Sequence, residues 1–372
     1  MSILKKEVIP LTKSLPFYII SLFFTSFMMW QPIVYFCGNI AFVFFISLYI
    51  TVNLFYPIST KMTQYKFKRL FDAIGIYVMS FQITFTIAAF FDLFLKIILV
   101  FMFKMEVEVY VYVSAMIYFL TLTITIFGAI NAQITYDKSY TITFNKLRDN
   151  LHIVHLSDLH IGSITNFKKI DEIVRRVNEK NPDIICITGD TFTENLKDIT
   201  NIEKIADILN RLKSKYGTYA CLGNHDAGRD FEEIVNFFES ANIKLLCDEY
   251  IEFDDFNLIG RLDVTPAGFK AERKSIFELT ELVSLNKLNI VLDHQPKELL
   301  EIAETGVDLT LSGHTHGGQF FPLHIVIKWF FPHYRGVKKI KDMYSVICSG
   351  TCSAMPPIRI GSKSELVSIY IK

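Results

Sequence analysis

The sequence predicts a two-part chain, in which an all-α membrane-spanning region over residues 1–132 precedes an α/β domain over residues 133–372. Long uncharged runs fill the first part, whereas short apolar runs alternate with charged amphipathic segments in the second. The charge divides in the same way, because residues 1–132 carry nine Lys and Arg against five Asp and Glu, while the whole chain is neutral. The two parts are therefore suited to different solvents, lipid and water.

Two membrane helices are predicted in the first uncharged run, which covers the 46 residues 15–60. A spanning helix needs about 20 apolar residues, so this run is long enough for two crossings. Pro32 lacks the amide hydrogen that a continuing helix requires, and we therefore expect a tight turn at Gln31-Pro32. The expected helices cover residues 14–30 and 33–56.

Two further spans bring the predicted total to four. The third covers residues 73–103 and contains Asp92 and Lys96, which share a helical face and are expected to neutralise each other. We favour a structural pair near the membrane edge, with a functional intramembrane site as the alternative. The fourth run, residues 109–136, is uncharged and too long for a soluble strand.

The short loops predict the orientation of these spans. Lys and Arg concentrate before the first span and between the second and third, which places the N-terminus in the cytoplasm. An even number of spans returns residues 133–372 to the same side, so we expect a multi-pass protein of the cell membrane whose second part lies in the cytoplasm. No small-residue cleavage site follows the first apolar run, which argues against a cleavable signal peptide.

Composition excludes several classes of protein. Hydrophobic residues make up 51% of the chain and the net charge is zero, which excludes a disordered chain and a strongly basic nucleic-acid binder. No nucleic acid polymer is therefore expected as a partner. The six cysteines contain no CxxC pair, so we interpret them as reduced thiols that pack as small apolar residues.

The second part reads as an α/β domain. Residues 133–144 alternate as an exposed strand would, and amphipathic helices are expected at residues 167–180 and 202–215. Buried strands that alternate with helices are typical of α/β domains with internal sheets. Five buried strands are predicted, at LHIVHL (151–156), DIICIT (183–188), TYACL (218–222), NIVL (289–292) and DLTL (308–311).

Each of the five buried strands runs directly into a cluster of carboxylate, imidazole or amide side chains. Ligands of open α/β sheets bind beyond the carboxyl ends of the strands, so these clusters are expected to share one rim. Imidazole and carboxylate together suit Mn, Fe, Zn or Ni better than Ca or Mg. The candidate ligands are too many for one ion and fit two divalent ions (Mn, Zn or Fe) if one carboxylate bridges them. They are Asp158, His160, Asp190, Asn224, His294, His314 and His316.

At this point the chain resembles the calcineurin-like metallophosphoesterases, whose pattern is D-x-H, G-D, G-N-H-D, a lone H and G-H-x-H. All five elements occur in this order over residues 151–319. The tail PPIRIGSKSE (356–365) is similar to the end of the bacterial membrane-associated branch of that family. The resemblance covers residues 133–372 and implies a four-layer α/β sandwich of the metallophosphoesterase type.

The resemblance also implies two metal sites with one shared ligand. Two ions about 3.5–4 Å apart clamp a phosphoryl group and lower the pKa of a bridging water, which yields a hydroxide nucleophile. Asp158, His160 and His316 would hold the first metal, Asn224, His294 and His314 would hold the second, and Asp190 would bridge the two.

His225 and Asp226 are the candidate catalytic residues within the same motifs. His225 is not needed as a ligand and is free to protonate the leaving group or to bind the equatorial oxygens. Asp226 is expected to orient His225 through its other ring nitrogen.

One aromatic segment, residues 321–339, has two interpretations. It packs in the core if the domain behaves as a soluble enzyme. In a domain tethered to a bilayer it contacts the headgroup region instead, and such a contact favours lipid-linked phosphate substrates. The side chains that would make this contact are Trp329, Phe330, Phe331, Tyr334, Arg335, Lys338 and Lys339.

The predicted function is that of a membrane-anchored, dinuclear metal-dependent phosphohydrolase. Phosphomonoester, phosphodiester and pyrophosphate cleavage use the same site chemistry, and the membrane context favours a phosphodiester or pyrophosphate linked to an envelope lipid. The alternative is a membrane sensor that binds a phosphorylated ligand without turnover, which could tolerate the loss of His225. A third possibility is a membrane transporter that the hydrolase gates, but only Asp92 and Lys96 support it.

Overall fold

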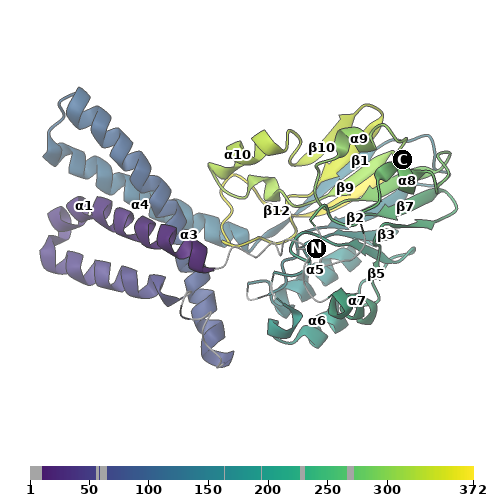
Figure 1. Ribbon diagram of the computed structural model, residues 1–372, viewed down its shortest axis with the longest axis horizontal. Helices are drawn as coiled ribbons and strands as arrows, with labels where there is room; N and C mark the ends of the chain where they lie inside the picture. The colour runs from purple at the N-terminus through teal and green to yellow at the C-terminus, as the bar shows by residue number, and fades with distance from the viewer. Residues whose placement is uncertain are drawn as a thin grey trace, which may run out of the picture. The chain divides into compact units, whose positions relative to one another are not determined.

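The computed structural model describes residues 11–55, 58, 65–162, 164–193, 195–226, 231–265 and 272–372. Its internal contacts divide the chain into two compact units. The helical unit comprises Met1–Ile130 with Met355–Pro357, and the α/β unit comprises Asn131–Ala354 with Ile358–Lys372. Figure 1 shows helices alone in the first unit and two sheets with helices in the second.

The described part of the helical unit consists of long apolar helices. α1 covers Leu11–Asn53, α3 covers Tyr65–Lys96 and α4 covers Val107–Ala132, and a π-helix at Ile97–Met102 continues α3. These helices indicate membrane association, because about 20 apolar residues are enough to cross a bilayer. Three segments are long and apolar enough to do so: Tyr18–Asn53, Leu70–Met102 and Val107–Ala132.

α1 is broken at Gly38 and folds back on itself. Gly38 has φ 79° and ψ 167°, a conformation that is essentially restricted to glycine. The hydroxyl of Tyr18 lies 2.5 Å from Oδ1 of Asn53, 35 residues further along the chain, so the two ends of α1 lie side by side. In Figure 1 the purple part of the chain is drawn as two helices rather than one straight helix. The turn predicted at Gln31-Pro32 is therefore wrong, since the helix continues through both residues and reverses where a Cβ is absent.

The polar groups of the helical unit find partners on neighbouring helices. The carboxylate of Asp92 is buried and accepts hydrogen bonds from the Tyr110 hydroxyl (2.6 Å) and the Ser114 hydroxyl (2.9 Å). The Lys96 ammonium donates to the side-chain carbonyl of Gln31 (2.6 Å). These two charges were expected to neutralise each other, but each takes a partner from another helix, as polar groups in lipid require.

Two sheets form the centre of the α/β unit. The first has the order β1-β12-β2-β3-β4-β5 and the second has the order β10-β11-β9-β8-β7-β6. β2, β3, β4 and β5 run parallel, as do β7, β8, β9 and β11, whereas β12 runs antiparallel to β2. The bounds are β1 Thr135–Ile142, β2 Leu151–Leu156, β3 Ile184–Thr188, β4 Thr218–Cys221, β5 Lys244–Leu245, β6 Glu249–Glu252, β7 Phe256–Gly260, β8 Leu288–Leu292, β9 Leu309–Ser312, β10 Gly336–Ile340, β11 Met343–Ile347 and β12 Ser364–Ile371.

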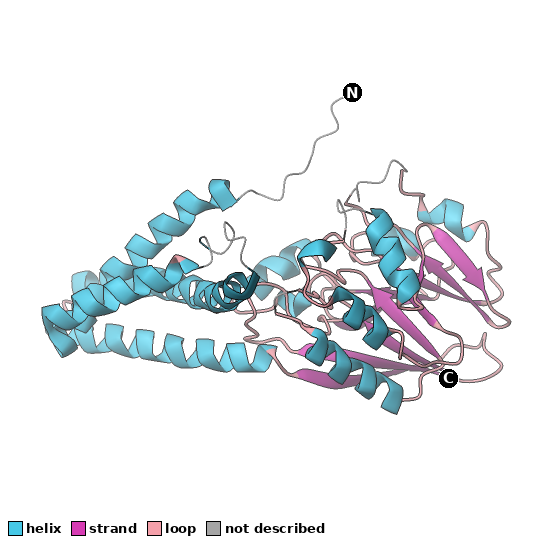
Figure 2. Ribbon diagram, turned by 90° about the horizontal axis from the view of Figure 1, so that it is seen from below, coloured by secondary structure: helices cyan, strands magenta, loops and turns pink. Residues whose placement is uncertain are grey.

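The two sheets pack face to face and helices cover their outer faces. The apolar cluster between the sheets includes Cys186 and Val367 from one sheet and Leu258, Ile290 and Leu311 from the other. The cysteines among these side chains pack as apolar residues, as expected. The predicted α/β sandwich with four layers is confirmed, and Figures 1 and 2 show helices on both sides of the strands.

The outer helices have the sequence features that their positions require. α5 (Phe167–Glu179) buries Ile170, Ile173, Val174 and Val177 on one face, and Asn166 caps its first turn. α6 (Ile202–Leu209) and α7 (Phe231–Ser240) complete this layer, and α8 (Ile276–Thr280) and α9 (Leu299–Ile302) cover the second sheet. Each buried aliphatic side chain contributes about 1.5–3 kcal/mol relative to an exposed one.

Candidate metal centre

The five polar clusters follow β2, β3, β4, β8 and β9, and the structure brings them to one edge of the sandwich. Several of their residues adopt left-handed backbone conformations, which cost a side chain-bearing residue about 1–2 kcal/mol. Strain of this kind concentrates at functional sites, where the surrounding structure compensates for it. The positive φ angles are 53° at Asp158, 47° at His160, 50° at Asp190, 70° at His314 and 50° at His316.

Two glycines let these loops approach one another closely. A Cβ at Gly313 would lie 1.8 Å from Oγ of Ser157 and 2.3 Å from Oδ2 of Asp158. A Cβ at Gly223 would lie 2.3 Å from the backbone nitrogen of Asp190. Any side chain at these two positions would push the carboxylates away from the site.

Asp158, His160 and His316 form the first group of potential ligands. Nε2 of His316 lies 3.1 Å from Oδ1 of Asp158 and 3.1 Å from Nε2 of His160. All three side chains are buried, and their ligand atoms lie within 4.8 Å of one another. Bonds of about 2.0–2.2 Å from one cation to nitrogen and oxygen donors bring those donors to such separations. The arrangement therefore fits a divalent ion.

Hydrogen bonds around this first group fix the direction of its donors. Nδ1 of His160 lies 3.0 Å from the Thr193 hydroxyl, which leaves Nε2 toward the group. The backbone amide of His314 donates to the Asp158 carboxylate at 3.1 Å, and the Ser157 hydroxyl lies 2.6 Å from the same carboxylate. Such contacts orient metal ligands before an ion arrives.

Asp190, His294 and His314 form the second group. Nε2 of His294 lies 3.2 Å from Oδ2 of Asp190, and the rings of His294 and His314 are 5.2 Å apart. Nδ1 of His294 donates to the backbone carbonyl of Thr188 at 2.8 Å, which directs Nε2 into the group. Oδ1 of Asn224 lies 3.2 Å from the same Nε2, so all seven predicted ligands meet at this edge.

The charges in the site are strongly coupled. Burial by itself raises the pKa of Asp158, but the neighbouring imidazoles, led by that of His316, lower this pKa well below its usual value. Burial lowers the pKa of His160 to about 3 and that of His314 to about 3, so both rings are neutral. For His294 the carboxylate of Asp190 outweighs burial and raises the pKa. Ionised carboxylates and neutral imidazoles are the forms that bind metal ions.

His225 lies at the exposed side of the site. Its ring is 5.2 Å from that of His160, in an edge-to-face arrangement, and its backbone amide donates to Oδ1 of Asp190 at 2.7 Å. The side chain is exposed, in contrast to the buried ligands around it. His225 is therefore the solvent-exposed imidazole beside the two groups.

Asp226 joins two of the loops. Its buried carboxylate accepts hydrogen bonds from the backbone amides of Thr191 (3.2 Å), Phe192 (3.0 Å) and Gly223 (3.0 Å). Burial, with the nearby charge of Asp190, raises the pKa of Asp226 to about 6. The structure thus shows a role in holding the loops after β3 and β4 together, and the orientation of His225 by Asp226 stays a prediction.

Arg359 is a functional residue that sequence reasoning missed. Its fully buried guanidinium donates to the backbone carbonyls of His316 and Cys352, each at 2.8 Å, and lies 3.2 Å from Nδ1 of His316. Burial lowers its pKa to about 10, so it keeps its charge. The motif PPIRIGSKSE contains this arginine, but only the fold brings it to His316, 43 residues earlier in the chain.

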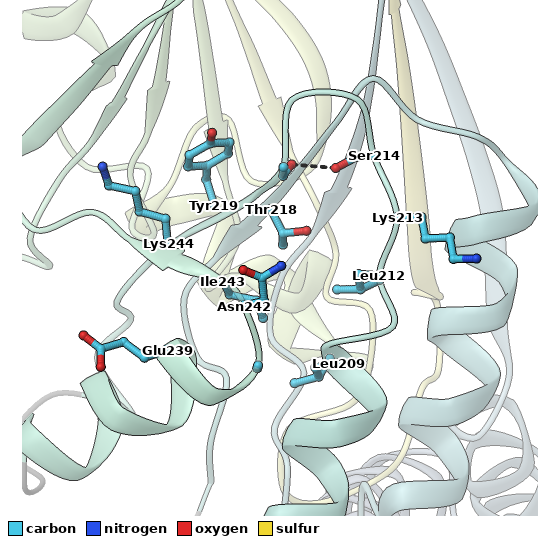
Figure 3. Close-up of a pocket in the computed structure, with 12 residues that line it drawn as sticks. Leu209, Leu212, Lys213, Ser214, Thr218, Tyr219, Glu239, Asn242, Ile243 and Lys244 are labelled. Atoms are coloured by element: carbon cyan, nitrogen blue, oxygen red, sulfur yellow. Dashed lines mark hydrogen bonds between the residues drawn. The ribbon is translucent and has the colours of Figure 1, made fainter.

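A pocket of the α/β unit lies elsewhere. It has a volume of about 690 Å³ and includes Gly217, Thr218 and Lys244, at the amino ends of β4 and β5 (Figure 3). Figure 3 shows the Ser214 hydroxyl bonded to the loop before β4, at 2.8 Å from the Gly217 carbonyl. None of the seven candidate ligands lines this pocket, so it takes no part in the metal chemistry.

Comparison with known proteins identifies relatives of the α/β unit. Residues 151–318 match the family model described as calcineurin-like phosphoesterase. An uncharacterized metallophosphoesterase of Helicobacter pylori is 32% identical over 236 residues, which are 63% of each chain. A transmembrane protein with metallophosphoesterase domain from Bos taurus is 28% identical over 243 residues, 60% of this chain and 53% of that protein. The chain thus spans less than two thirds of the length of these relatives.

Among solved structures, the Haemophilus influenzae NAD nucleotidase is similar in fold. The two structures superpose with a TM-score of 0.41 at 15% identity, over 56% of this chain and 46% of that protein.

Proposed function

From the premise that residues 151–318 form a domain of the calcineurin-like phosphoesterase family, we propose that the protein is a membrane-anchored, dinuclear metal-dependent phosphoester hydrolase. The single observation that carries this proposal is the pair of adjoining ligand groups at one edge of the sandwich, Asp158 with His160 and His316, and Asp190 with His294 and His314. Packing alone gives no reason to bury so many ionisable groups at one edge.

The donor set fits two divalent ions of the Mn, Zn or Fe type. Mixed imidazole, carboxylate and amide donors are suited to these metals. In our proposal Asn224 completes the second group and Asp190 is shared between the two, because its carboxylate lies 3.2 Å from Nε2 of His294 and its charge also acts on the imidazole of His160 in the first group. Two bound ions supply a clamp for the phosphoryl group and an activated water.

His225 is the residue that we propose to act on the substrate directly. Its exposed ring stands next to the ligand groups, where the leaving oxygen of a bound phosphoester needs a proton. Asp226 supports this position by holding the loops after β3 and β4 together. In its alternative role, the His225 imidazole binds the equatorial oxygens of the phosphoryl group instead of protonating the leaving group.

The membrane helices supply the context of the reaction. We propose four crossings, since α1 folds back at Gly38, and a domain on the cytoplasmic side, since basic residues precede the first span. A hydrolase held at a bilayer meets phosphoesters of lipids more often than soluble ones. We therefore propose a lipid-linked phosphodiester or pyrophosphate as the substrate class.

The first experiment measures hydrolysis of bis(p-nitrophenyl) phosphate by the full chain in detergent or nanodiscs, with Mn, Zn and Fe supplied in turn. We expect turnover that a chelator abolishes. In His225→Gln the rate on a phosphodiester with an alkoxide leaving group should fall by about 10²–10⁴-fold, the range for loss of a general acid, while metal affinity measured by calorimetry stays unchanged. The rate on bis(p-nitrophenyl) phosphate should fall much less, because p-nitrophenolate leaves without a proton.

His152→Gln is the matched control, because His152 stacks on Tyr370 in the same domain, away from the ligand groups, and should keep full turnover. A chain that binds two metal ions and phosphate but hydrolyses no ester would contradict the proposed hydrolase. That result would favour the sensor without turnover instead.

A further inference from the structure

α10 (Leu323–Phe330) is an apolar helix without a core to pack in. None of its eight residues is buried, and Trp329 is 87% exposed and Phe330 73% exposed. Elsewhere in the described part of the α/β unit, no other stretch of eight residues exposes as many large apolar side chains. A contiguous exposed patch of this kind marks a surface that contacts something else.

The following part of the same segment is anchored in the domain. Phe331 is buried and its ring lies 5.6 Å from that of His314, and the Thr315 hydroxyl donates to the Tyr334 carbonyl at 2.5 Å. The segment 321–339 therefore divides in two. Core packing holds for Phe331 and His333, whereas no residue of α10 is buried and Arg335, Lys338 and Lys339 are exposed.

α10 is mounted directly on the loop that carries two candidate metal ligands, His314 and His316. A Cβ at Gly318 would lie 2.4 Å from Cα of His324, so the helix backbone rests against a glycine of this loop. The ring of Phe331 holds the other end of the helix against His314. Any surface that α10 contacts is therefore next to the metal centre.

The charge around α10 selects the kind of partner. Lys328, Arg335, Lys338 and Lys339 are exposed, and residues 321–341 contain no Asp or Glu. A tryptophan and other apolar side chains flanked by basic residues suit the interface of a bilayer that contains anionic lipids. A second copy of this chain would present the same positive charge, which opposes self-association through this face.

We propose that α10 docks the domain onto the bilayer, with Trp329 and Phe330 inserted into the headgroup region and the basic side chains on anionic phosphates. The chain itself supplies a bilayer context, because three segments among its described residues are apolar enough to cross one. Resting on the proposed function, this docking presents the metal centre to phosphoesters at the membrane surface. Amphiphilic phosphoesters are then preferred to soluble ones.

The chain is well suited to a test by tryptophan fluorescence, since Trp30 and Trp329 are its only tryptophans. In Trp30→Phe, reconstituted at full length into vesicles of phosphatidylcholine and phosphatidylglycerol, all tryptophan emission comes from Trp329. We expect a blue-shifted emission that brominated lipids quench. The quenching should weaken when phosphatidylglycerol is omitted.

The control places the reporter at another exposed apolar position of the domain. Leu300 on α9 is 70% exposed and lies outside the α10 patch, so Leu300→Trp combined with Trp30→Phe and Trp329→Phe should give water-like emission without quenching. If Trp329 is quenched no more than the tryptophan at position 300, the docking proposal is wrong. This readout does not depend on turnover, so it decides docking even if the proposed hydrolase fails.

A second arm tests the consequence for substrates. Trp329→Ser with Phe330→Ser removes no buried side chain, so the fold should persist, and unchanged thermal unfolding checks this point. We expect hydrolysis of a phosphatidyl ester in mixed vesicles to fall by about tenfold while bis(p-nitrophenyl) phosphate is unaffected. The matched pair Leu300→Ser and Phe277→Ser should change neither rate. An equal loss on both esters in the α10 variant would contradict the preference for amphiphilic substrates.

Discussion

At the scale of single residues, the position of His316 depends on the buried guanidinium of Arg359, which forms no ion pair with a described carboxylate. No ion pair of Arg359 occurs among the described residues, and its guanidinium instead donates to backbone carbonyls and to the Ser353 hydroxyl. A planar guanidinium with five donors can bind several acceptors at fixed angles, which a lysine cannot do. Arg359 thus positions the loop that carries His316.

Arg359→Met is expected to weaken both the fold and the metal centre. Each buried carbonyl left without a donor costs about 1–3 kcal/mol, so unfolding should occur at a clearly lower temperature. Loss of a contact that orients a ligand should lower metal affinity by about 10–100-fold. Calorimetric titration with Mn²⁺ and thermal unfolding measure the two effects.

Two further variants test whether the effect of Arg359→Met comes from the hydrogen bonds made at this position or from the loss of a positive charge. Arg335→Met removes an exposed arginine that donates to the Gly361 carbonyl, and should change neither quantity. Arg359→Lys keeps the charge but not the fork of donors, and should recover only part of the affinity. Unchanged metal affinity in Arg359→Met would refute a positioning role.

At the scale of elements, the reversal of α1 depends on one backbone conformation. A Cβ at Gly38 would meet no atom within 4 Å, so packing does not require a glycine there. The requirement comes from φ 79° and ψ 167°, which residues with a side chain avoid. Pro32 removes one hydrogen bond but leaves the helix direction intact, so the break and the helix-breaking residue are six positions apart.

Gly38→Ala should therefore destabilise the helical unit by about 1–3 kcal/mol, through backbone strain alone. Ile40→Ala is the control, because Ile40 is 89% exposed and belongs to the helix after the break. Unfolding by sodium dodecyl sulfate, followed by circular dichroism in mixed micelles, measures the difference. Equal stability of the two variants would show that the break does not need glycine.

α10 illustrates a second property of elements. Its composition resembles that of a buried helix, and only the surrounding structure shows that no layer covers it. The neighbouring Phe331 and His333 are buried, so two parts of one apolar segment have opposite environments. An apolar sequence by itself does not distinguish protein from lipid as the covering phase.

At the scale of the whole α/β unit, the candidate metal centre contains residues from both sheets. Asp158, His160 and Asp190 follow strands of the first sheet, whereas His294, His314 and His316 follow strands of the second. Each ligand group therefore contains donors from both sheets. An ion bound to either group holds the sheets together at this edge.

Metal binding should accordingly stabilise the α/β unit as a whole. A metal ion present at about 100 times its dissociation constant adds about 2.7 kcal/mol to the free energy of unfolding. We expect Mn²⁺ or Zn²⁺ to raise the unfolding temperature of this unit in the full chain, and a chelator to reverse the change. Differential scanning calorimetry in detergent measures both.

Asp190→Asn is the comparison variant in the calorimetry. It removes one charge from the ligand set and should reduce the rise in unfolding temperature that the metal ion causes. His152→Gln should show the same metal-induced rise in unfolding temperature as the unsubstituted chain. If no divalent ion raises the unfolding temperature of the unsubstituted chain, the residues at this edge do not form a metal centre.

Local patterns were sufficient to predict much of this protein. Uncharged runs indicated long apolar helices, and alternating apolar strands and amphipathic helices indicated the α/β sandwich. The polar clusters after five strands led to seven candidate ligands, which the structure brings to one edge. This succeeds because parallel strands place their carboxyl ends together, so the order of short motifs along the chain already implies their proximity.

Other features were decided only by the tertiary structure. The partners of Asp92 and Lys96, the contact of Arg359 with His316 and the exposure of α10 all depend on segments far apart in the sequence. Their common physical reason is that burial and hydrogen bonding are satisfied between elements rather than within them. Periodicity shows which face of an element is apolar, whereas packing determines what that face contacts.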